Sequence, residues 1–421
     1  MKEDFKRTVL DNGVRIVSEK MRSVQSISIG IWVEAGSRDE SDPQGGVSHL
    51  IEHLLFKGTE KRSALDISKE IESVGGYINA GTDRENTCYY IKAPSAHRQV
   101  AVDILFDIYL HSRFDPEEVE RERQVVLQEV RMTDDSPEEL IHDNFQRAMW
   151  GEHPIGRPIQ GTMETVGSIS REGITAYFNE VVKKGNLVVA AAGDIDHSWL
   201  VDTVASSLED AVIDFEPKPR SLPESMAGVS VQTKDLEQVH LCLGVEGLAA
   251  VDENRYALYL FNTILGVGMS SRLFQEIREK RGLAYAIGSF LSLYTDAGVL
   301  GVYAGTTKEH VEEVLSVVRD QLVLLRNKKV DSANISRAKE QIKGSLLISN
   351  EGSGARMSRI AKNEIYYQRH IPIKESVARI DKVTGEQLKK VTGNLIRSDN
   401  LLIAALGNLE VDDIPDELRT L

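Results

Sequence analysis

The amino-acid sequence repeats itself, and this repeat constrains the fold more than any other feature. The apolar run at 186–195, NLVVAAAGDI, returns at 400–409 as NLLIAALGNL. A second motif, Glu-Ile with a glycine six positions after the glutamate, begins at Glu70 and again at Glu276, an offset of 206 positions. Each apolar run has the length of a buried strand and ends in a glycine-containing turn. We therefore expect two copies of one folding unit.

Length and a proline-rich connector set the expected domain limits. A chain of 421 residues exceeds what one ordinary hydrophobic core supports, so two domains are expected. Residues 215–223, FEPKPRSLP, hold three of the 11 prolines and are typical of a semi-rigid connector. We predict one domain at 1–215, a linker at 216–223 and a homologous domain at 224–421.

Each half mixes strand and helix patterns in a way that favours the α+β class. Residues 26–33, SISIGIWV, have the pattern of a strand, and long stretches elsewhere have the period of amphipathic helices. Hairpin-like strands stand beside clustered helices instead of alternating strictly with them. The prediction is two homologous domains related by internal duplication, each a mainly antiparallel sheet with helices packed on it.

Composition and charge exclude several kinds of partner. With 41% hydrophobic and 27% charged residues the chain is globular in character, and its net charge of −15 repels nucleic acid and anionic membranes. No run of 18 apolar residues occurs, and Met1–Arg7 contains acids and no apolar h-region. We expect a cytoplasmic protein, with a mature organellar form as the alternative. Cys88 and Cys242 could form one bridge, but two free thiols are favoured.

The segment 49–53, HLIEH, carries the strongest chemical signal. Positions i and i+4 share one face of a helix, so His49 and His53 can reach one metal ion. Glu52 lies beside that face, where a carboxylate could take a proton from metal-bound water. This order, HxxEH, is the inverzincin signature. The alternative is two core histidines that hydrogen-bond to Glu52 and to the backbone.

A catalytic zinc usually has three protein ligands, and the best candidate for the third lies on a helix that begins near Asp115 and Pro116. On that helix Glu122 and Glu129 share one stripe with valines, which predicts that both carboxylates face the interior. The alternative is a solvated helix whose acids pair with arginine. Histidine and carboxylate ligands suit zinc, but the residues alone do not separate zinc from manganese or cobalt.

The second copy lacks these residues. The offset of 206 places 255–259, RYALY, at the position of the metal motif, and this segment has no histidine. The region that corresponds to Glu129, around Ser345, offers no carboxylate. We therefore predict one metal ion per chain, held by the first copy.

A candidate substrate strand follows the metal motif. The segment 77–82, YINAGT, turns through 83–86 into a second strand, which predicts a hairpin. Its small, uncharged residues differ from the charged edges that block strand pairing. An open edge could bind an extended peptide by strand addition, and an interior strand is the alternative. The predicted peptide-binding residues are Asn79, Ala80, Gly81 and Thr82.

These motifs together resemble the pitrilysin/insulinase family of zinc peptidases. HxxEH is followed 76 positions after His53 by Glu129, and Glu122 lies seven positions before it. The neighbouring segments 45–48, 56–59 and 75–80 fit as well, and the length looks most like the mitochondrial processing peptidase beta subunit and its bacterial relatives. The resemblance implies that His49, His53 and Glu129 bind Zn²⁺. It implies that Glu52 is the general base and that Glu122 orients a ligand histidine.

The resemblance also gives a role to the second half. Family members have an arginine and, seven residues later, a tyrosine that bind substrate and stabilise the tetrahedral intermediate. Arg278 and Tyr285 match that spacing, although from the sequence alone they would be a surface arginine and a core tyrosine. The implied assembly is a homodimer in which the partner subunit supplies this pair. The implied substrate is an extended peptide inside a clamshell chamber.

Two other functions fit the same family. One is a noncatalytic assembly subunit like the core proteins of the respiratory bc1 complex, which typically have damaged metal motifs. Here all five motif residues are present, and this favours an active zinc endopeptidase. The other is a presequence-processing subunit that needs a different partner. His153, in a loop before a proline, is interpreted as a turn or packing residue and not as a ligand.

Overall fold

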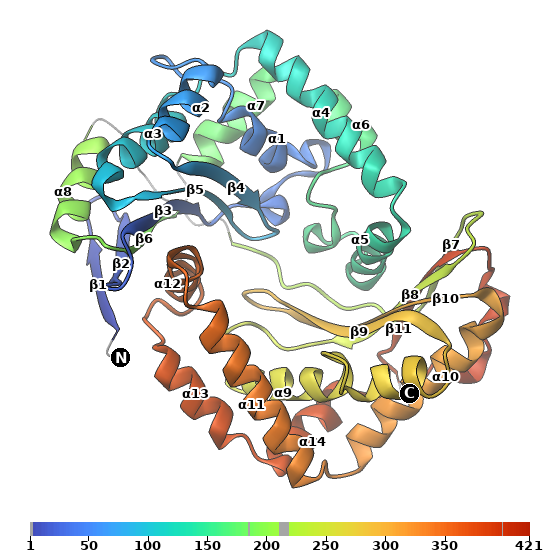
Figure 1. Cartoon of the computed structure of the whole chain (residues 1–421). Helices are drawn as coiled ribbons and strands as arrows, with labels where there is room; N and C mark the ends of the chain where they lie inside the picture. The colour runs from blue at the N-terminus through green and yellow to red at the C-terminus, as the bar shows by residue number, and fades with distance from the viewer. Residues whose placement is uncertain (1–2, 184–185, 210–218, 398) are drawn as a thin grey trace. The chain divides into compact units, whose positions relative to one another are not determined.

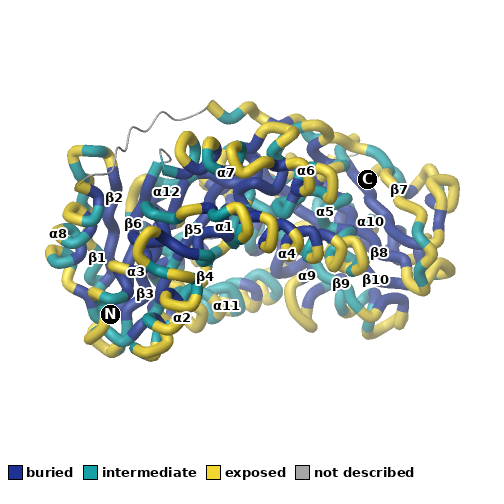
Figure 2. Tube along the Cα trace, turned by 90° about the horizontal axis from the view of Figure 1, so that it is seen from above, coloured by how far each residue is buried: buried dark blue, intermediate teal, exposed yellow. Residues whose placement is uncertain are grey.

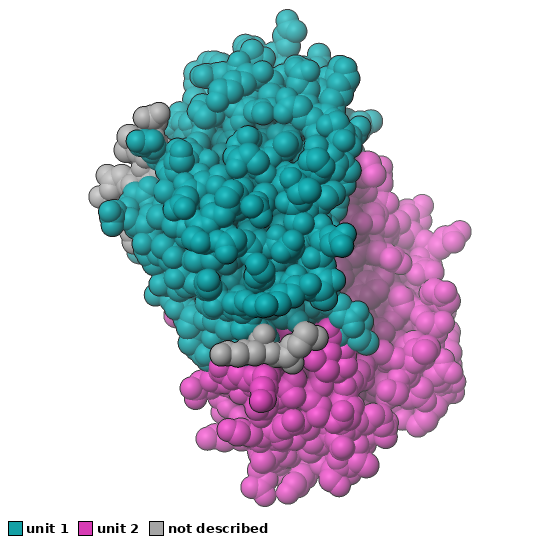
Figure 3. Space-filling model, turned by 60° about the vertical axis from the view of Figure 1, so that its left-hand side comes forward, with its two compact units in different colours: residues 1–131, 157–220, 348–372 teal, residues 132–156, 221–347, 373–421 magenta. Residues whose placement is uncertain are grey.

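The computed structural model describes residues 3–183, 186–209, 219–397 and 399–421, and these form two compact units. Unit 1 comprises Met1–Arg131, Arg157–Arg220 and Ile348–Pro372, and unit 2 comprises Met132–Gly156, Ser221–Leu347 and Ile373–Leu421 (Figure 3). Each unit is therefore built mostly from one half of the sequence and takes one segment from the other half. The predicted linker 216–223 lies partly outside the described residues, and the predicted domain limits remain a prediction.

Unit 1 contains a six-stranded sheet in the order β1-β2-β6-β3-β5-β4 (Figure 1). The strands are β1 Asp4–Val9, β2 Arg15–Lys20, β3 Ser26–Val33, β4 Tyr77–Thr82, β5 Thr87–Pro94 and β6 Leu187–Gly193. β2 and β6 are parallel, and the other neighbouring pairs are antiparallel. β3 and β6 are buried along almost their whole length (Figure 2), so they form the centre of the unit.

Unit 2 repeats this plan with five strands in the order β7-β11-β8-β10-β9. The strands are β7 Gly228–Thr233, β8 Val239–Glu246, β9 Ala284–Leu293, β10 Gly298–Thr306 and β11 Leu402–Gly407. Here β7 and β11 are the parallel pair, and β9 occupies the edge that β4 occupies in unit 1. The matching strand order and direction confirm the predicted α+β fold with internal duplication.

Helices cover one face of each sheet and enclose its main core. In unit 1 they are α1 Val47–Leu54, α2 Ala64–Ser73, α3 Arg98–His111, α4 Pro116–Asp134, α6 Met163–Ser168, α7 Arg171–Tyr177 and α8 His197–Ser207. In unit 2 they are α9 Arg255–Gly266, α10 Val311–Asn327, α11 Ser332–Ser349, α13 Ile373–Lys382 and α14 Gly385–Leu395. In both sheets the alternating side chains of the strands supply the other side of this core.

The opposite face of each sheet packs against a helix from the other half of the sequence. α12 (Ser353–Tyr367) places Met357, Ile360 and Ala361 on the sheet of unit 1. α5 (Pro137–Trp150) places Ile141, Phe145 and Met149 on the sheet of unit 2. The two halves have thus exchanged corresponding helices, and neither half completes a unit alone.

A buried ion pair holds α12 in unit 1. Glu364 is 1% exposed and accepts two hydrogen bonds from the Arg7 guanidinium of β1, at 2.9 and 2.8 Å. Its backbone carbonyl accepts a bond from Arg15 of β2. Because a buried carboxylate needs a cation beside it, these arginines fix the position of the helix on the strands.

Two further predictions concern the whole chain. Cys88 and Cys242 are both free in this structure, and Cys242 is buried. None of the helices in the described part of the chain is long and apolar enough to cross a membrane.

The helix exchange predicts where a core mutation in α5 will act. Phe145 is fully buried against strands of the second half, so Phe145→Ala should lower the free energy of unfolding by about 3–5 kcal/mol. Amide hydrogen exchange should become faster in β8 and β11, as measured by mass spectrometry. Arg147→Ala, on the exposed side of the same helix, is the matched control. Faster exchange confined to β3 and β6 would contradict the exchanged arrangement.

Candidate metal centre

The packing of α1 determines which way the motif residues face. Leu50, Ile51 and Leu54 are fully or almost fully buried, whereas the motif side chains between them are only partly buried. The helix therefore cannot rotate without exposing its apolar side chains to water. His49, Glu52 and His53 consequently share the remaining side.

The start of α1 is fixed by a buried carboxylate. Glu40 accepts hydrogen bonds from the backbone N–H groups of Gly46 and Ser48, each at 2.8 Å. These groups have no partner within the helix, so the carboxylate serves as a cap. Burial raises the pKa of Glu40 to about 8, although both amides act in the opposite direction. Gly46 has a φ of +92°, and a Cβ there would lie 2.5 Å from the carbonyl oxygen of Gln160, so this turn requires glycine.

α4 brings both predicted glutamates to this side of α1. The Glu129 carboxylate lies 3.6 Å from Nε2 of His49 and 3.6 Å from Nε2 of His53. One ligand atom from each of the three residues lies within 4.8 Å of the others, the only such group of three among the residues that the structure describes. The predicted ligands therefore converge from two separate helices.

Glu122 lies behind His53 and not among the converging atoms. Its carboxylate is 3.3 Å from Nδ1 of His53, and its other oxygen is 2.8 Å from the Lys57 ammonium. An Nδ1–H that donates to Glu122 leaves the Nε2 lone pair of His53 directed toward Glu129. Glu122 thus lies where a carboxylate that orients a ligand histidine is expected.

The donor set fits a divalent cation such as zinc. Burial and the neighbouring His53 lower the pKa of His49 to about 4, so its imidazole is neutral at pH 7. The imidazole nitrogens of His49 and His53 and the Glu129 carboxylate then place three electron-pair donors around one point. This arrangement is unfavourable without a cation, and histidine nitrogen with carboxylate oxygen is a common zinc ligand set.

Glu52 is held beside this group by the hairpin. The Thr82 hydroxyl at the end of β4 donates to its carboxylate at 2.5 Å. Burial raises the pKa of Glu52, and the Thr82 hydroxyl partly offsets this shift. With its pKa raised by burial and partly lowered again by Thr82, the Glu52 carboxyl group can accept or release a proton beside the candidate metal ligands.

The candidate substrate strand lies at the edge of its sheet. β4 pairs with β5 on one side, and the described residues of unit 1 supply no strand on its other side. The alternative of an interior strand is therefore wrong. Asn79 and Gly81 are exposed, whereas Ala80 and Thr82 are half-buried toward the core. The side chain of Thr82 is engaged with Glu52.

Arg278 and Tyr285 form a pair in unit 2. The Arg278 guanidinium lies 4.7 Å from the centre of the Tyr285 ring. Tyr285, in β9, is 79% exposed, so its interpretation from sequence alone as a core tyrosine is wrong. The corresponding turn of α9 carries Arg255 and Tyr259 in place of His49 and His53.

His153 bonds to Ser221 through Nε2 and to the backbone of Ile155 through Nδ1, as expected for a turn residue.

Sequence analysis did not identify Glu40 or Lys57. Glu40 acts on backbone groups six and eight positions away, and Lys57 acts on a carboxylate of another helix. An acid ahead of a glycine turn and a helix is a signal of a helix cap that could have pointed to Glu40. Nothing in the sequence pattern could have indicated the partner of Lys57.

Comparisons with known proteins agree with this geometry. The family model described as insulinase, peptidase family M16, matches residues 15–163, and the model described as peptidase M16 inactive domain matches residues 168–342. A Streptomyces coelicolor protein is 40% identical and spans 93% of this chain and 87% of its own length. A Bacillus subtilis protein is 36% identical, and the match spans 96% of this chain and 99% of the relative. Both relatives are named as zinc proteases.

Solved structures share the fold. A peptidase M16 inactive domain from Pseudomonas fluorescens has a TM-score of 0.90 at 20% identity and covers 97% of this chain and 99% of its own. A protease from Helicobacter pylori has a TM-score of 0.89 at 22% identity, and the match covers 96% of this chain and 100% of the protease chain. At these identities the likeness shows the architecture alone.

The contact between Glu122 and His53 predicts a measurable effect on metal binding. Glu122→Gln should weaken Zn²⁺ binding by about 10–100-fold, because a neutral amide oxygen is a weaker acceptor for the Nδ1–H of His53 than a carboxylate. Competition with a chelator measures the affinity. Glu117→Gln, at an exposed position of the same helix, should leave it unchanged. Equal affinities for Glu122→Gln and the unaltered chain would show that Glu122 has no part in the centre.

Proposed function

The chain belongs to the insulinase family, peptidase family M16, and on that premise we propose that it is a zinc-dependent endopeptidase for extended peptides or short unfolded polypeptides. Family membership and relatives named as zinc proteases support a zinc peptidase. One observation carries the finer proposal. His49, His53 and Glu129 converge beside Glu52, which is hydrogen-bonded to an edge strand. Metal ligands, a proton acceptor and a strand edge are what hydrolysis of an extended peptide requires.

His49, His53 and Glu129 would hold one zinc ion per chain. When bound, zinc supplies a Lewis acid that lowers the pKa of a water molecule and polarises a carbonyl group. Glu52 takes the proton of the attacking water and then passes it to the leaving amine. Thr82 keeps the Glu52 carboxylate in place, and Glu122 with Lys57 keeps His53 oriented.

The peptide would bind as an added strand on β4. Along Asn79, Ala80 and Gly81 alternate residues direct their backbone N–H and C=O groups to the outer side of β4, and this edge has no strand partner among the described residues of unit 1. Hydrogen bonds to a peptide backbone do not depend on its side chains, so this mode suits substrates of varied sequence.

Arg278 and Tyr285 would complete the site from a second copy of the chain. A guanidinium stacked on an exposed phenol offers a positive charge and an O–H donor to the oxyanion that develops during attack. We propose a homodimer that encloses the peptide in a chamber, each subunit supplying this pair to its partner. The likeness in length to the mitochondrial processing peptidase beta subunit remains a prediction.

The role of Glu52 predicts a separation of metal binding from turnover. Glu52→Gln should retain one zinc per chain, because Glu52 is not among the converging ligand atoms. Its kcat on an internally quenched peptide should fall by about 10²–10⁴-fold, because the amide cannot accept the proton. Glu72→Gln, an exposed acid of α2, controls for the change of charge. Hydrolysis close to the unaltered rate in the zinc-replete variant would remove Glu52 from its role.

Completion by the partner predicts complementation between two inactive variants. Glu52→Gln and Tyr285→Phe should each be nearly inactive alone. After subunit exchange, about half of the dimers are mixed, and one of their two sites has both an intact Glu52 and an intact Tyr285. Activity should therefore recover to about a quarter of the unaltered level. Activity that never exceeds the sum of the separate variants would show that the pair does not act in trans.

A further inference from the structure

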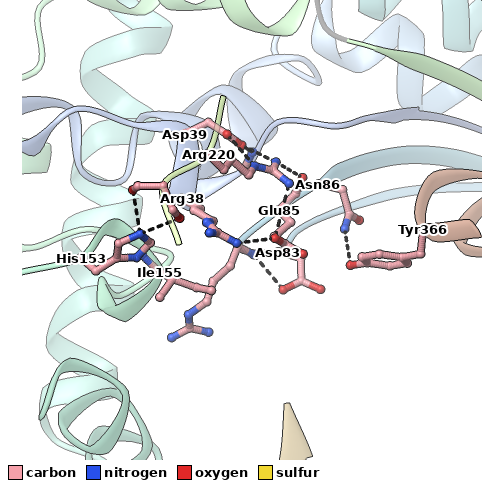
Figure 4. Close-up of polar contacts among 12 residues, drawn as sticks. Arg38, Asp39, Asp83, Glu85, Asn86, His153, Ile155, Arg220 and Tyr366 are labelled. Atoms are coloured by element: carbon pink, nitrogen blue, oxygen red, sulfur yellow. Dashed lines mark hydrogen bonds and ion pairs between the residues drawn. The ribbon is translucent and has the colours of Figure 1, made fainter. Parts of the chain in front are cut away.

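A cluster of charged side chains in unit 1 joins three segments that are far apart in the sequence. We call Arg38, Asp39, Glu85 and Arg220 the Arg220 cluster (Figure 4). Arg220 donates two hydrogen bonds to the Asp39 carboxylate, at 3.0 and 2.8 Å, and one to the backbone carbonyl of Glu85, at 2.8 Å. Arg38 donates to the Glu85 carboxylate at 2.7 Å. Two arginines thus balance two acids.

The cluster is too buried to be an ordinary surface ion pair. The side chains of Arg38 and Glu85 are 1% and 2% exposed, and that of Asp39 is 10% exposed. Exposed ion pairs contribute little, whereas removal of one partner from a buried pair leaves a charge without compensation. The geometry of this cluster is therefore tightly constrained.

Two of the three segments also meet through their backbones. Asp39 ends the short helix η1 (Ser37–Asp39), and Glu85 lies in the turn between β4 and β5. The backbone N–H of Arg38 donates to the carbonyl of Arg84 at 2.8 Å. A Cβ on Gly36 would lie 2.2 Å from the carbonyl oxygen of Asp83, so the approach is as close as glycine permits.

Both segments continue directly into the candidate site. Glu40, the residue after Asp39, caps the start of α1. Thr82, at the end of β4 and just before the turn, donates to Glu52. A shift of the turn relative to η1 would therefore move Thr82 relative to the helix that carries Glu52.

Arg220 supplies the third attachment from a distant part of the chain. It lies 181 positions after Asp39 and 135 positions after Glu85, in the proline-rich connector 216–223. Its planar guanidinium contacts both segments at once, which the compact ammonium of a lysine could not do with the same geometry. The Arg220 side chain thus hydrogen-bonds to both η1 and the turn at 83–86.

We propose that Arg220 is a positioning residue for the peptidase reaction, a proposal that rests on the proposed function. It fixes the β4–β5 turn against η1, and this keeps Thr82 on Glu52 and the edge strand in register with α1. Arg220, a residue of the predicted linker, thus has a part in the reaction. Within the described residues, the Arg220 side chain forms its hydrogen bonds and ion pairs with Asp39 and Glu85, and not with a candidate metal ligand or with Glu52.

Hydrogen exchange tests the positioning without reference to activity. In the zinc-loaded full chain, Arg220→Lys should retain one zinc per chain and make amide exchange in residues 77–94 about ten-fold faster. Arg7→Lys is the matched control, because Arg7 also makes two hydrogen bonds to a buried carboxylate of unit 1 but contacts another region. Unchanged exchange in 77–94, or an equal effect of Arg7→Lys, would overturn the proposal. Asp39→Asn weakens the same contact, because it removes the charge and one of the two acceptor oxygens, and it replaces Arg220→Lys if that variant does not fold.

Kinetics then test the consequence for the reaction. With an internally quenched extended peptide, kcat/KM should fall about ten-fold in Arg220→Lys and stay unchanged in Arg7→Lys, after correction for zinc content. Faster exchange with unchanged kcat/KM would make Arg220 purely structural and overturn the proposal. Absence of hydrolysis by the unaltered chain would instead overturn the proposed function, and the positioning role with it. The exchange measurement distinguishes the two failures.

Discussion

The burial of α1 is the constraint on which the rest of the site depends. Leu50, Ile51 and Leu54 leave the helix one orientation, and Glu40 fixes where it begins. In that orientation the two imidazoles face α4. The buried valines of α4 pack in the core and direct its glutamates toward the same imidazoles. Apolar packing therefore brings together polar groups that would otherwise stay apart, each hydrated by water. A cation is what makes this convergence favourable.

The duplication separates the scaffold from the chemistry. Both units have the same strand order, the same parallel pair and an edge strand in the corresponding place. In α9, however, Arg255 and Tyr259 occupy the positions of His49 and His53. The second unit is thus free to present other side chains, and the Arg278–Tyr285 pair lies at the start of its edge strand. The exchange of α5 and α12 makes each unit depend on the other half of the chain for its core.

Local periodicity predicted much of the fold and of the site. The spacing of His49 and His53 gave their shared face, and the valine stripe placed Glu122 and Glu129 on the side of α4 that faces these histidines. The repeat predicted two similar sheets. These inferences succeed because helix and strand periods fix which side chains share a face.

Contacts between distant segments could not be predicted in this way. A hydrophobic stripe shows that α5 and α12 are buried, but not against which sheet. Similarly, the spacing of residues cannot reveal that Lys57 pairs with Glu122, or that Thr82 holds Glu52. Tyr285 was misjudged from its residue type, because aromatic residues are usually buried and this one is exposed.

Anomalous diffraction at the zinc absorption edge tests the central claim most directly. The account predicts one peak about 2.0–2.2 Å from Nε2 of His49, Nε2 of His53 and the Glu129 carboxylate. A zinc-loaded crystal with no peak there, or with these side chains directed apart, would contradict it.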